Sequence, residues 1–154
     1  MSIYVLALLI GIIAGLRTMT ALAAISWAAH LGWLPLQATP LAFMGFAITP
    51  YILTVLAIGE LITDQLPRTP SRKVPIQFGA RLVSGGLCGA AIGASRQVLV
   101  AGLVAGVAGA VIGTMGGAKA RTAIAQAIGR DVPAALLEDL VAVGGAAWIV
   151  AVMS

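Results

Sequence analysis

The sequence predicts an all-α integral membrane protein with about five transmembrane helices, and three observations lead to this fold class. Hydrophobic residues make up 60% of the 154-residue chain and charged residues only 9%, with a mean hydropathy of +1.06. Soluble domains carry about 25% charged residues, so a soluble fold of this composition would lack the charges to cover its surface. Several apolar stretches also approach or exceed the roughly 20 residues with which a helix crosses a bilayer. At this length the chain forms a single polytopic membrane domain, residues 1–154.

Hydropathy and helix-breaking residues divide the chain into five predicted spans: residues 3–32, 41–66, 76–93, 98–117, and a last span that begins near Pro133. Pro50 falls in the middle of the second span, where it removes a backbone donor and interrupts the helix. A basic, weakly amphipathic segment, residues 119–131, follows the fourth span. Its last residue, Asp131, can cap the final helix, because a carboxylate accepts hydrogen bonds from unpaired backbone N–H groups.

An arginine, Arg17, lies near the middle of the first span, in a run that is otherwise apolar from Ile3 to Ala29. As one helix this run would rise about 40 Å, more than the roughly 30 Å of a bilayer's hydrocarbon core. A charge at the centre of a span costs at least about 2.5–3.5 kcal/mol. The excess length permits either one long helix or two short re-entrant helices with Arg17 at the tip of the hairpin.

The loop charges predict how the chain is oriented. Six basic residues fall in two loops that a five-span chain places on one side of the membrane: Arg68, Arg72, Lys73, Lys119, Arg121 and Arg130. Only Arg96 falls on the other side, so the positive-inside rule predicts a cytoplasmic N-terminus and an external C-terminus. Trp33 and Trp148 would then lie near the outer interface. A cleaved signal peptide is not expected, since no basic residue precedes the first apolar run.

Ionisable side chains from four predicted spans are expected to meet in one polar cluster: Arg17, Arg81, Glu60, Asp64, Glu138 and Asp139. An unpaired buried charge is far costlier than a paired one, which favours their convergence inside the bundle. Intramembrane ionisable residues mark functional sites by default, so the cluster is a candidate substrate or ion site. The alternative is structural: the charges neutralise one another and fix the register of the helices.

Glycines recur at four-residue spacing in three sets through the third and fourth spans: Gly85, Gly89 and Gly93, then Gly102 and Gly106, then Gly109, Gly113 and Gly117. Small residues let helix backbones approach closely in a membrane. These faces either pack against each other within the chain or form the seam of a homo-oligomer.

The sequence lacks the signatures of common enzymes, since it has no HExxH, no Walker loop and no GxSxG. A lone Cys88 and a lone His30 provide neither a disulfide nor a metal site. We expect no cofactor, although the carboxylates offer oxygen ligands to a divalent cation such as Mg²⁺. The net charge of +4 reflects basic cytoplasmic loops rather than nucleic-acid binding.

Four motifs, GLR, GELITDQLP, GARLVSGGLCGA and LLEDL, carry a resemblance to a known family. On these motifs the chain resembles, over nearly its whole length, the small bacterial membrane proteins called domain of unknown function 4126. The resemblance falls on eight residues: Arg17, Glu60, Asp64, Pro67, Arg81, Arg121, Glu138 and Asp139. It departs at Gln65, where family members often have a lysine. The resemblance implies a membrane fold of about five spans with a polar cluster, and no particular activity.

We therefore expect a small multi-pass transporter or translocase in the bacterial cytoplasmic (inner) membrane. Arg17 and Arg81 would bind an anionic group or balance the carboxylates, and the carboxylates would bind a coupling cation or proton. The first alternative is a membrane-embedded enzyme that acts on a lipid phosphate. The second is a non-catalytic membrane scaffold that uses its glycine faces.

Overall fold

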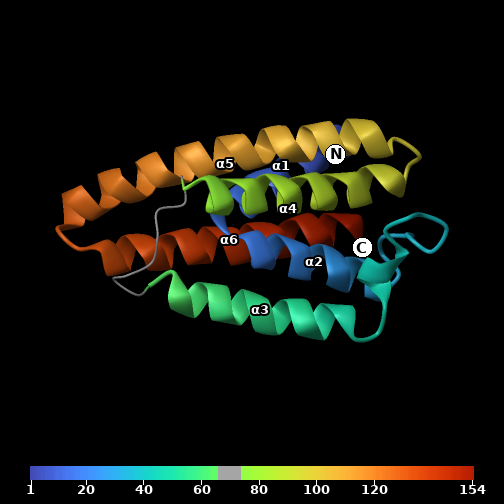
Figure 1. The fold of residues 1–154 in the computed structure, drawn as a ribbon, viewed down its shortest axis with the longest axis horizontal. Helices are drawn as coiled ribbons and strands as arrows, with labels where there is room; N and C mark the ends of the chain where they lie inside the picture. Colours follow the sequence, from blue (N-terminus) through green and yellow to red (C-terminus); the bar gives the residue numbers. More distant parts are fainter. Residues whose placement is uncertain (66–73) are drawn as a thin grey trace.

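The prediction of an all-α fold is confirmed by a computed structural model, which describes residues 1–65 and 74–154. The described residues form six α-helices and one short 3-10 helix, and no strand is found among them. In chain order the elements are α1 (Ile3–Leu16), α2 (Thr18–His30), η1 (Ala42–Gly45), α3 (Thr49–Thr63), α4 (Pro75–Ala94), α5 (Leu99–Ile128) and α6 (Asp131–Met153). The helices lie roughly along one long axis, with α5 and α6 extending beyond the others at one end (Figure 1).

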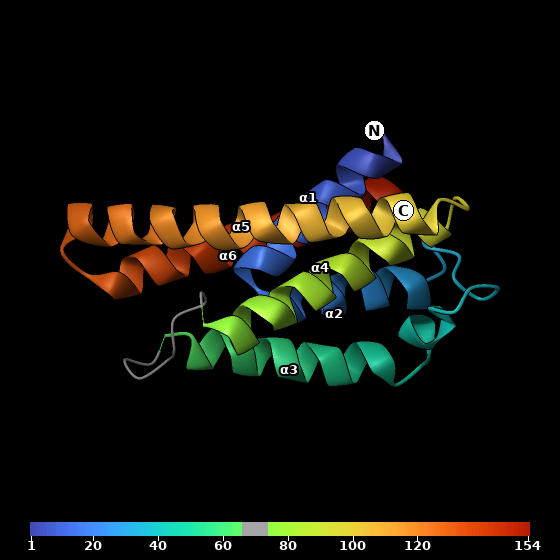
Figure 2. The same ribbon diagram turned by 45° about the horizontal axis from the view of Figure 1, so that its top comes forward.

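The first predicted span is broken at a single residue. Arg17 has an extended backbone, with φ −141° and ψ 108°, between the end of α1 and the start of α2. Its own N–H still bonds to the carbonyl of Ile13, and its carbonyl accepts from the N–H of Ala21. The chain reverses direction there, so that α1 and α2 form a hairpin with Arg17 at its tip (Figures 1 and 2). Of the two structures that the span length permits, the chain forms the pair of short helices with Arg17 at the tip of the hairpin.

Both chain termini lie at the same end of the bundle (Figure 1). Met1 and Ser154 line one pocket of about 730 Å³, together with Trp33 and with Arg96 from the turn between α4 and α5. The predicted topology, with termini on opposite sides of a membrane, does not fit this arrangement. The physical reason is the reversal of the chain at Arg17. Because α2 runs back along the bundle, the first two helices begin and end at the same end of it.

Three further boundaries differ from the predictions. The second predicted span is wrong in its first part, because α3 begins only at Thr49 and Pro50 lies in its first turn, where a missing N–H costs nothing. The basic segment is not a separate amphipathic element, since α5 runs without interruption to Ile128. Asp131 is the first residue of α6, whose N-cap is Arg130, and its carboxylate forms a salt bridge with Arg121.

Two helices among the described residues, α5 and α6, are long and apolar enough to cross a membrane. By length and composition, α1 and α3 are shorter apolar helices. Five crossing helices are therefore not confirmed. At a rise of 1.5 Å per residue, the 30 residues of α5 extend about 45 Å, so this helix exceeds the thickness of a hydrocarbon core.

Glycine faces join α5 to its two neighbours within the chain. A side chain at Gly106 would collide with the backbone of Gly85 on α4, and one at Gly109 would collide with the carbonyl of Leu8 on α1. Gly102 lies in the same way against Gly89. These faces therefore serve packing within the chain, and a homo-oligomer stays a prediction.

The outermost helix of the bundle, α3, packs on α2 and η1 and buries few of its own side chains. Only Pro50 and Ala57 are fully buried on it. The indole N–H of Trp27 on α2 donates a 2.9 Å hydrogen bond to the hydroxyl of Thr54, and its ring meets Tyr51 edge to face. The polar contacts of Glu60 and Asp64 lie near its C-terminal end.

Candidate functional site

Arg17 is fully buried, and its guanidinium is enclosed by carboxylates from two other helices. Its Nε donates a 2.6 Å hydrogen bond to Oδ1 of Asp139 on α6, and its Nη2 forms an ion pair with the same carboxylate. Its Nη1 pairs with Oδ2 of Asp64, the residue that ends α3. Glu138 lies 3.9 Å from the same nitrogen. A single guanidinium thus links the hairpin tip to both α3 and α6.

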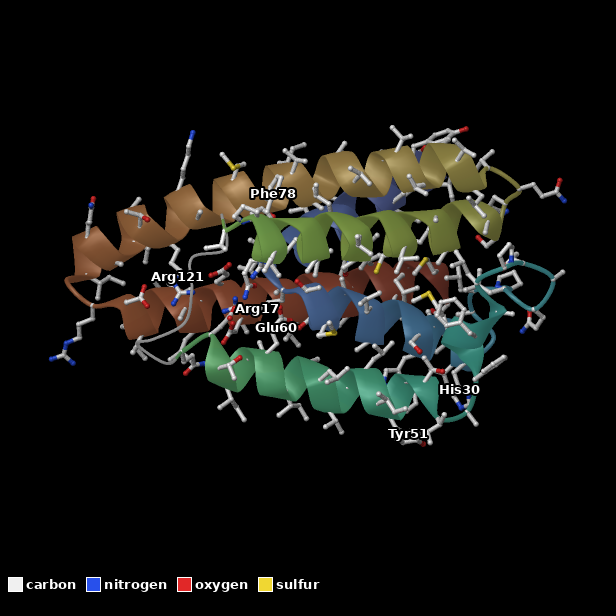
Figure 3. All side chains as sticks on the ribbon, in the orientation of Figure 1. Arg17, His30, Tyr51, Glu60, Phe78 and Arg121 are labelled. Atoms are coloured by element: carbon white, nitrogen blue, oxygen red, sulfur yellow. The ribbon has the colours of Figure 1, made fainter. Side chains whose placement is uncertain are left out.

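Glu60 on α3 accepts hydrogen bonds from the backbone N–H groups at the start of α2. Its two carboxylate oxygens accept 2.8 Å hydrogen bonds from the backbone N–H groups of Thr18 and Met19. The first N–H groups of a helix have no partner within it and carry a partial positive charge. A carboxylate from another helix therefore supplies both the hydrogen bonds and the complementary charge, and Glu60 lies beside Arg17 in Figure 3.

Arg81 on α4 donates hydrogen bonds to the unpaired carbonyl groups at the end of α1. Its Nη1 donates 2.8 Å hydrogen bonds to the carbonyls of Gly15 and Leu16. The hydroxyl of Thr114, halfway along α5, donates a 3.3 Å bond to the same Gly15 carbonyl. The last carbonyls of a helix are unpaired and partly negative, so a guanidinium is favoured there. The two helix ends created by the break at Arg17 are thus both neutralised by side chains from elsewhere in the bundle.

A third arginine, Arg121 of α5, connects the cluster to the end of the bundle formed by α5 and α6. It forms a salt bridge with the exposed Asp131 and lies 3.7 Å from Glu138. Its Nη2 also donates a 3.3 Å hydrogen bond to the backbone carbonyl of Asp64. Figure 3 shows Arg121 farther toward the end formed by α5 and α6 than Arg17.

The six residues predicted for the site divide into two groups in the structure. Four of them meet through ion-pair contacts: Arg17, Asp64, Glu138 and Asp139. Glu60 and Arg81 bind the two backbone ends that flank Arg17 rather than its guanidinium. The expected convergence of these charges is therefore what the structure contains, whereas their role as a substrate site stays a prediction.

Sequence reasoning did not assign a site role to three polar residues that the structure places here. The amide of Gln65 donates a 3.0 Å hydrogen bond to Oδ2 of Asp139. Ser84 donates a 2.9 Å bond to the carbonyl of Thr18, and Thr114 donates to Gly15. Only Gln65 stood out in the sequence, because the chain differs at this position from the family that it resembles. The serine and threonine are the ordinary small residues of glycine-rich helices, so no pattern distinguished them.

The chemistry available at the site is that of guanidinium and carboxylate groups. Among the described residues, no group of three or more His, Cys, Asp or Glu side chains is placed to hold a metal ion. Arg17 contacts carboxylates and Arg81 contacts carbonyls, so both arginines balance charges of the protein itself. The carboxylates are the groups that can exchange a proton or a cation.

Comparison with family models, with curated proteins and with solved structures gave no match to this chain. The resemblance to domain of unknown function 4126 therefore stays a prediction that rests on the four motifs.

Proposed function

We propose that the chain is an integral membrane protein of about four helices and a re-entrant hairpin. The support is its surface, where bulky aliphatic side chains are exposed along the outer helices: Val55, Ile58, Ile62, Val100, Val104, Ile112, Leu140 and Val141. A water-soluble monomer rarely exposes contiguous apolar area on this scale. Lipid would cover these faces in a membrane.

We further propose that both termini face the outside of a bacterial cytoplasmic membrane. The basic ends of α5 and α6 lie opposite the termini, with Lys119, Arg121 and Arg130 near them. The positive-inside rule assigns such an end to the cytoplasm. The α1–α2 hairpin would then enter from outside and carry Arg17 inward, since the 14 residues of α1 rise about 21 Å.

The proposed activity is the transport of a solute or lipid, and one observation carries it. Arg17 is 0% exposed at the tip of a broken helix pair, and its ion partners belong to two other helices. A continuous helix with an apolar residue at this position would avoid both the helix break and the buried charges, which are costly. Discontinuous helices with charges at their facing ends form the binding sites of many transporters.

In this proposal Arg17 and Arg81 stabilise the arrangement of the helices, and the carboxylates bind the coupling ion. Arg17 keeps α3 and α6 against the hairpin, and Arg81 fixes the end of α1. Asp64, Glu138 and Asp139 bind the coupling cation or proton.

The test is a flux measurement with purified protein in liposomes. Concentration jumps of potassium, chloride, inorganic phosphate or protons are applied one at a time, and lipid scrambling is followed with a fluorescent phospholipid. We expect at least one of these signals above that of empty liposomes. Arg17→Lys and Glu60→Gln should abolish it, because lysine cannot span both carboxylates and glutamine lacks the charge that α2 requires.

Arg96→Gln is the matched control, since Arg96 is exposed at the far end of the bundle and outside the cluster. It should fold and transport as the wild type does. The proposal fails if folded wild-type protein moves none of these probes, or if Arg17→Lys protein reconstitutes normally and keeps the full signal.

A further inference from the structure

The start of α2 is occupied by a side chain from another helix. The two carboxylate oxygens of Glu60 accept 2.8 Å hydrogen bonds, one from the N–H of Thr18 and one from the N–H of Met19. Because α2 has 13 residues, its dipole gives this end a partial positive charge. Carboxylate and phosphate ligands bind to the first N–H groups of a helix in the same way. Glu60 therefore stands where the oxygens of an external anion would bind.

Thr20, the third residue of α2, is buried with its hydroxyl group unpaired. The residue is 8% exposed, and among the described residues its Oγ1 has no hydrogen-bond partner. A buried hydroxyl without a partner costs free energy, since its hydrogen bonds to water are lost. Three other buried hydroxyl groups of the bundle each donate to a backbone carbonyl: Ser26, Ser84 and Thr114. Thr20 thus offers a polar atom that the fold itself does not use.

The Thr20 hydroxyl is directed toward the end of α2 that Glu60 binds. In an α-helix every Cα–Cβ bond tilts toward the N-terminus, so a side chain in the first turn points back to the helix start. The N–H groups of the first turn face the same end. An oxyanion bound there has three donors, the two N–H groups of Thr18 and Met19 and the hydroxyl of Thr20. Glu60 uses only the first two.

We propose that the start of α2 is the substrate site, and that Glu60 occupies it until a carboxylate or phosphate group of the substrate takes its place. The substrate class is then an anionic solute or a lipid with such a group. This inference rests on the proposed function, because it names what the transporter binds.

The exchange of Glu60 for an external anion preserves both the charge and the packing of the bundle. One oxyanion replaces another, so the charge at the helix start does not change. Glu60 and Met19 are half-buried, so the site is partly open at the surface of the bundle. The end of α3 stays in place when Glu60 leaves, because Asp64 remains paired with Arg17 and Arg121 remains bound to the Asp64 carbonyl.

Hydrogen exchange of Glu60→Ala protein in a neutral detergent tests the site without transport. The amides of Thr18 and Met19 should exchange about tenfold faster than in the wild type, which corresponds to the loss of about 1.4 kcal/mol. Sodium formate, inorganic phosphate or phosphatidylglycerol should slow this exchange again, whereas sodium chloride of equal ionic strength should not. Protection by phosphatidylglycerol alone assigns a lipid headgroup, and protection by formate or phosphate assigns a free solute. If none of the three protects these amides, the proposal is wrong.

The contribution of the hydroxyl is tested in the same assay. Thr20→Val, added to Glu60→Ala, should remove the protection by the anion. Thr122→Val, at an exposed position of α5, is the matched control and should keep it. Protection that survives Thr20→Val would remove this residue from the site.

A second pair of variants covers the case in which Glu60→Ala does not fold. In the wild-type background, Thr20→Val should leave the equilibrium constant of unfolding unchanged. Thr114→Val should raise it about tenfold, because the Thr114 hydroxyl donates a hydrogen bond within the bundle. Equal increases for both variants would show that the Thr20 hydroxyl already has a partner, and would overturn the proposal.

None of these readouts involves flux, so the outcomes for binding and for transport can be separated. Anion protection without any flux would reject only the proposed function. Flux without anion protection would reject only this inference.

Discussion

Arg17 and Asp139 are 122 positions apart in the sequence, yet Nε of the arginine donates a 2.6 Å hydrogen bond to Oδ1 of the aspartate. This contact closes the bundle around the hairpin tip, because it joins the break between the first two helices to the last one. Asp64 completes the tie from α3. The stability of the bundle is therefore expected to depend on Arg17, Asp64 and Asp139 together rather than on any one of these charges.

Arg17→Gln should lower the free energy of unfolding in detergent micelles by about 3–5 kcal/mol, because it leaves two buried carboxylates without their cation. Adding Asp64→Asn and Asp139→Asn should recover part of this loss, since no charge then remains unbalanced. Denaturant titration measures both effects. Arg96→Gln serves as the control, with an expected change within about 0.5 kcal/mol. Equal stability of Arg17→Gln and wild type would show that the arginine is not the cation on which the cluster depends.

Glu60→Ala should destabilise the start of α2 by about 1–2 kcal/mol, the usual cost of losing an N-terminal cap together with its favourable charge. The loss should be local, since Glu60 binds the backbone of Thr18 and Met19. Hydrogen exchange followed by mass spectrometry should detect faster exchange in peptides that contain these amides. Peptides from α5 and α6 provide the control within the same sample. Unchanged exchange at the start of α2 would mean that Glu60 does not cap it.

Gly106→Ala should destabilise the protein by about 1–3 kcal/mol, the usual range for overpacking. The added methyl group would meet the backbones of Gly85 and Gly89, which cannot move without separating α4 from α5. Gly116→Ala is a matched control in the same helix, because nothing lies within 4 Å of a side chain there. It should be neutral or stabilising by up to about 1 kcal/mol, since alanine favours the helix. Similar unfolding curves for both variants would refute the close approach of these two helices.

The convergence of the charges could be predicted from the sequence because an unpaired charge inside an apolar bundle costs too much free energy. A carboxylate or guanidinium in an apolar bundle must find a partner, and only a few such groups exist in this chain. The glycine spacing likewise pointed to close helix contacts, although it could not show that the partners lie within the chain. Gly106 meets Gly85 of the same chain, and that contact follows only from the fold.

The path of the chain could not be predicted in the same way. Hydropathy does not distinguish an apolar loop from an apolar helix, so residues 41–48 were assigned to a span that begins only at Thr49. The reversal at Arg17 depends on one extended residue, whose cost is offset by Glu60 and Arg81 from distant helices. No local sequence pattern indicates that side chains from distant helices stabilise an extended residue. The position of both chain termini at one end of the bundle follows from the reversal at this residue.

The most direct test of the account concerns the hairpin itself. Single cysteines at Ser2, Gln37, Gln126 and Ser154, all exposed, are introduced in a Cys88→Ala background and labelled in sealed, oriented membrane vesicles with a reagent that cannot cross the bilayer. We predict that Ser2, Gln37 and Ser154 react from one side and Gln126 from the other. If Ser2 and Gln37 instead react from opposite sides, the first two helices cross the membrane as one span, and the re-entrant hairpin with Arg17 at its tip is wrong.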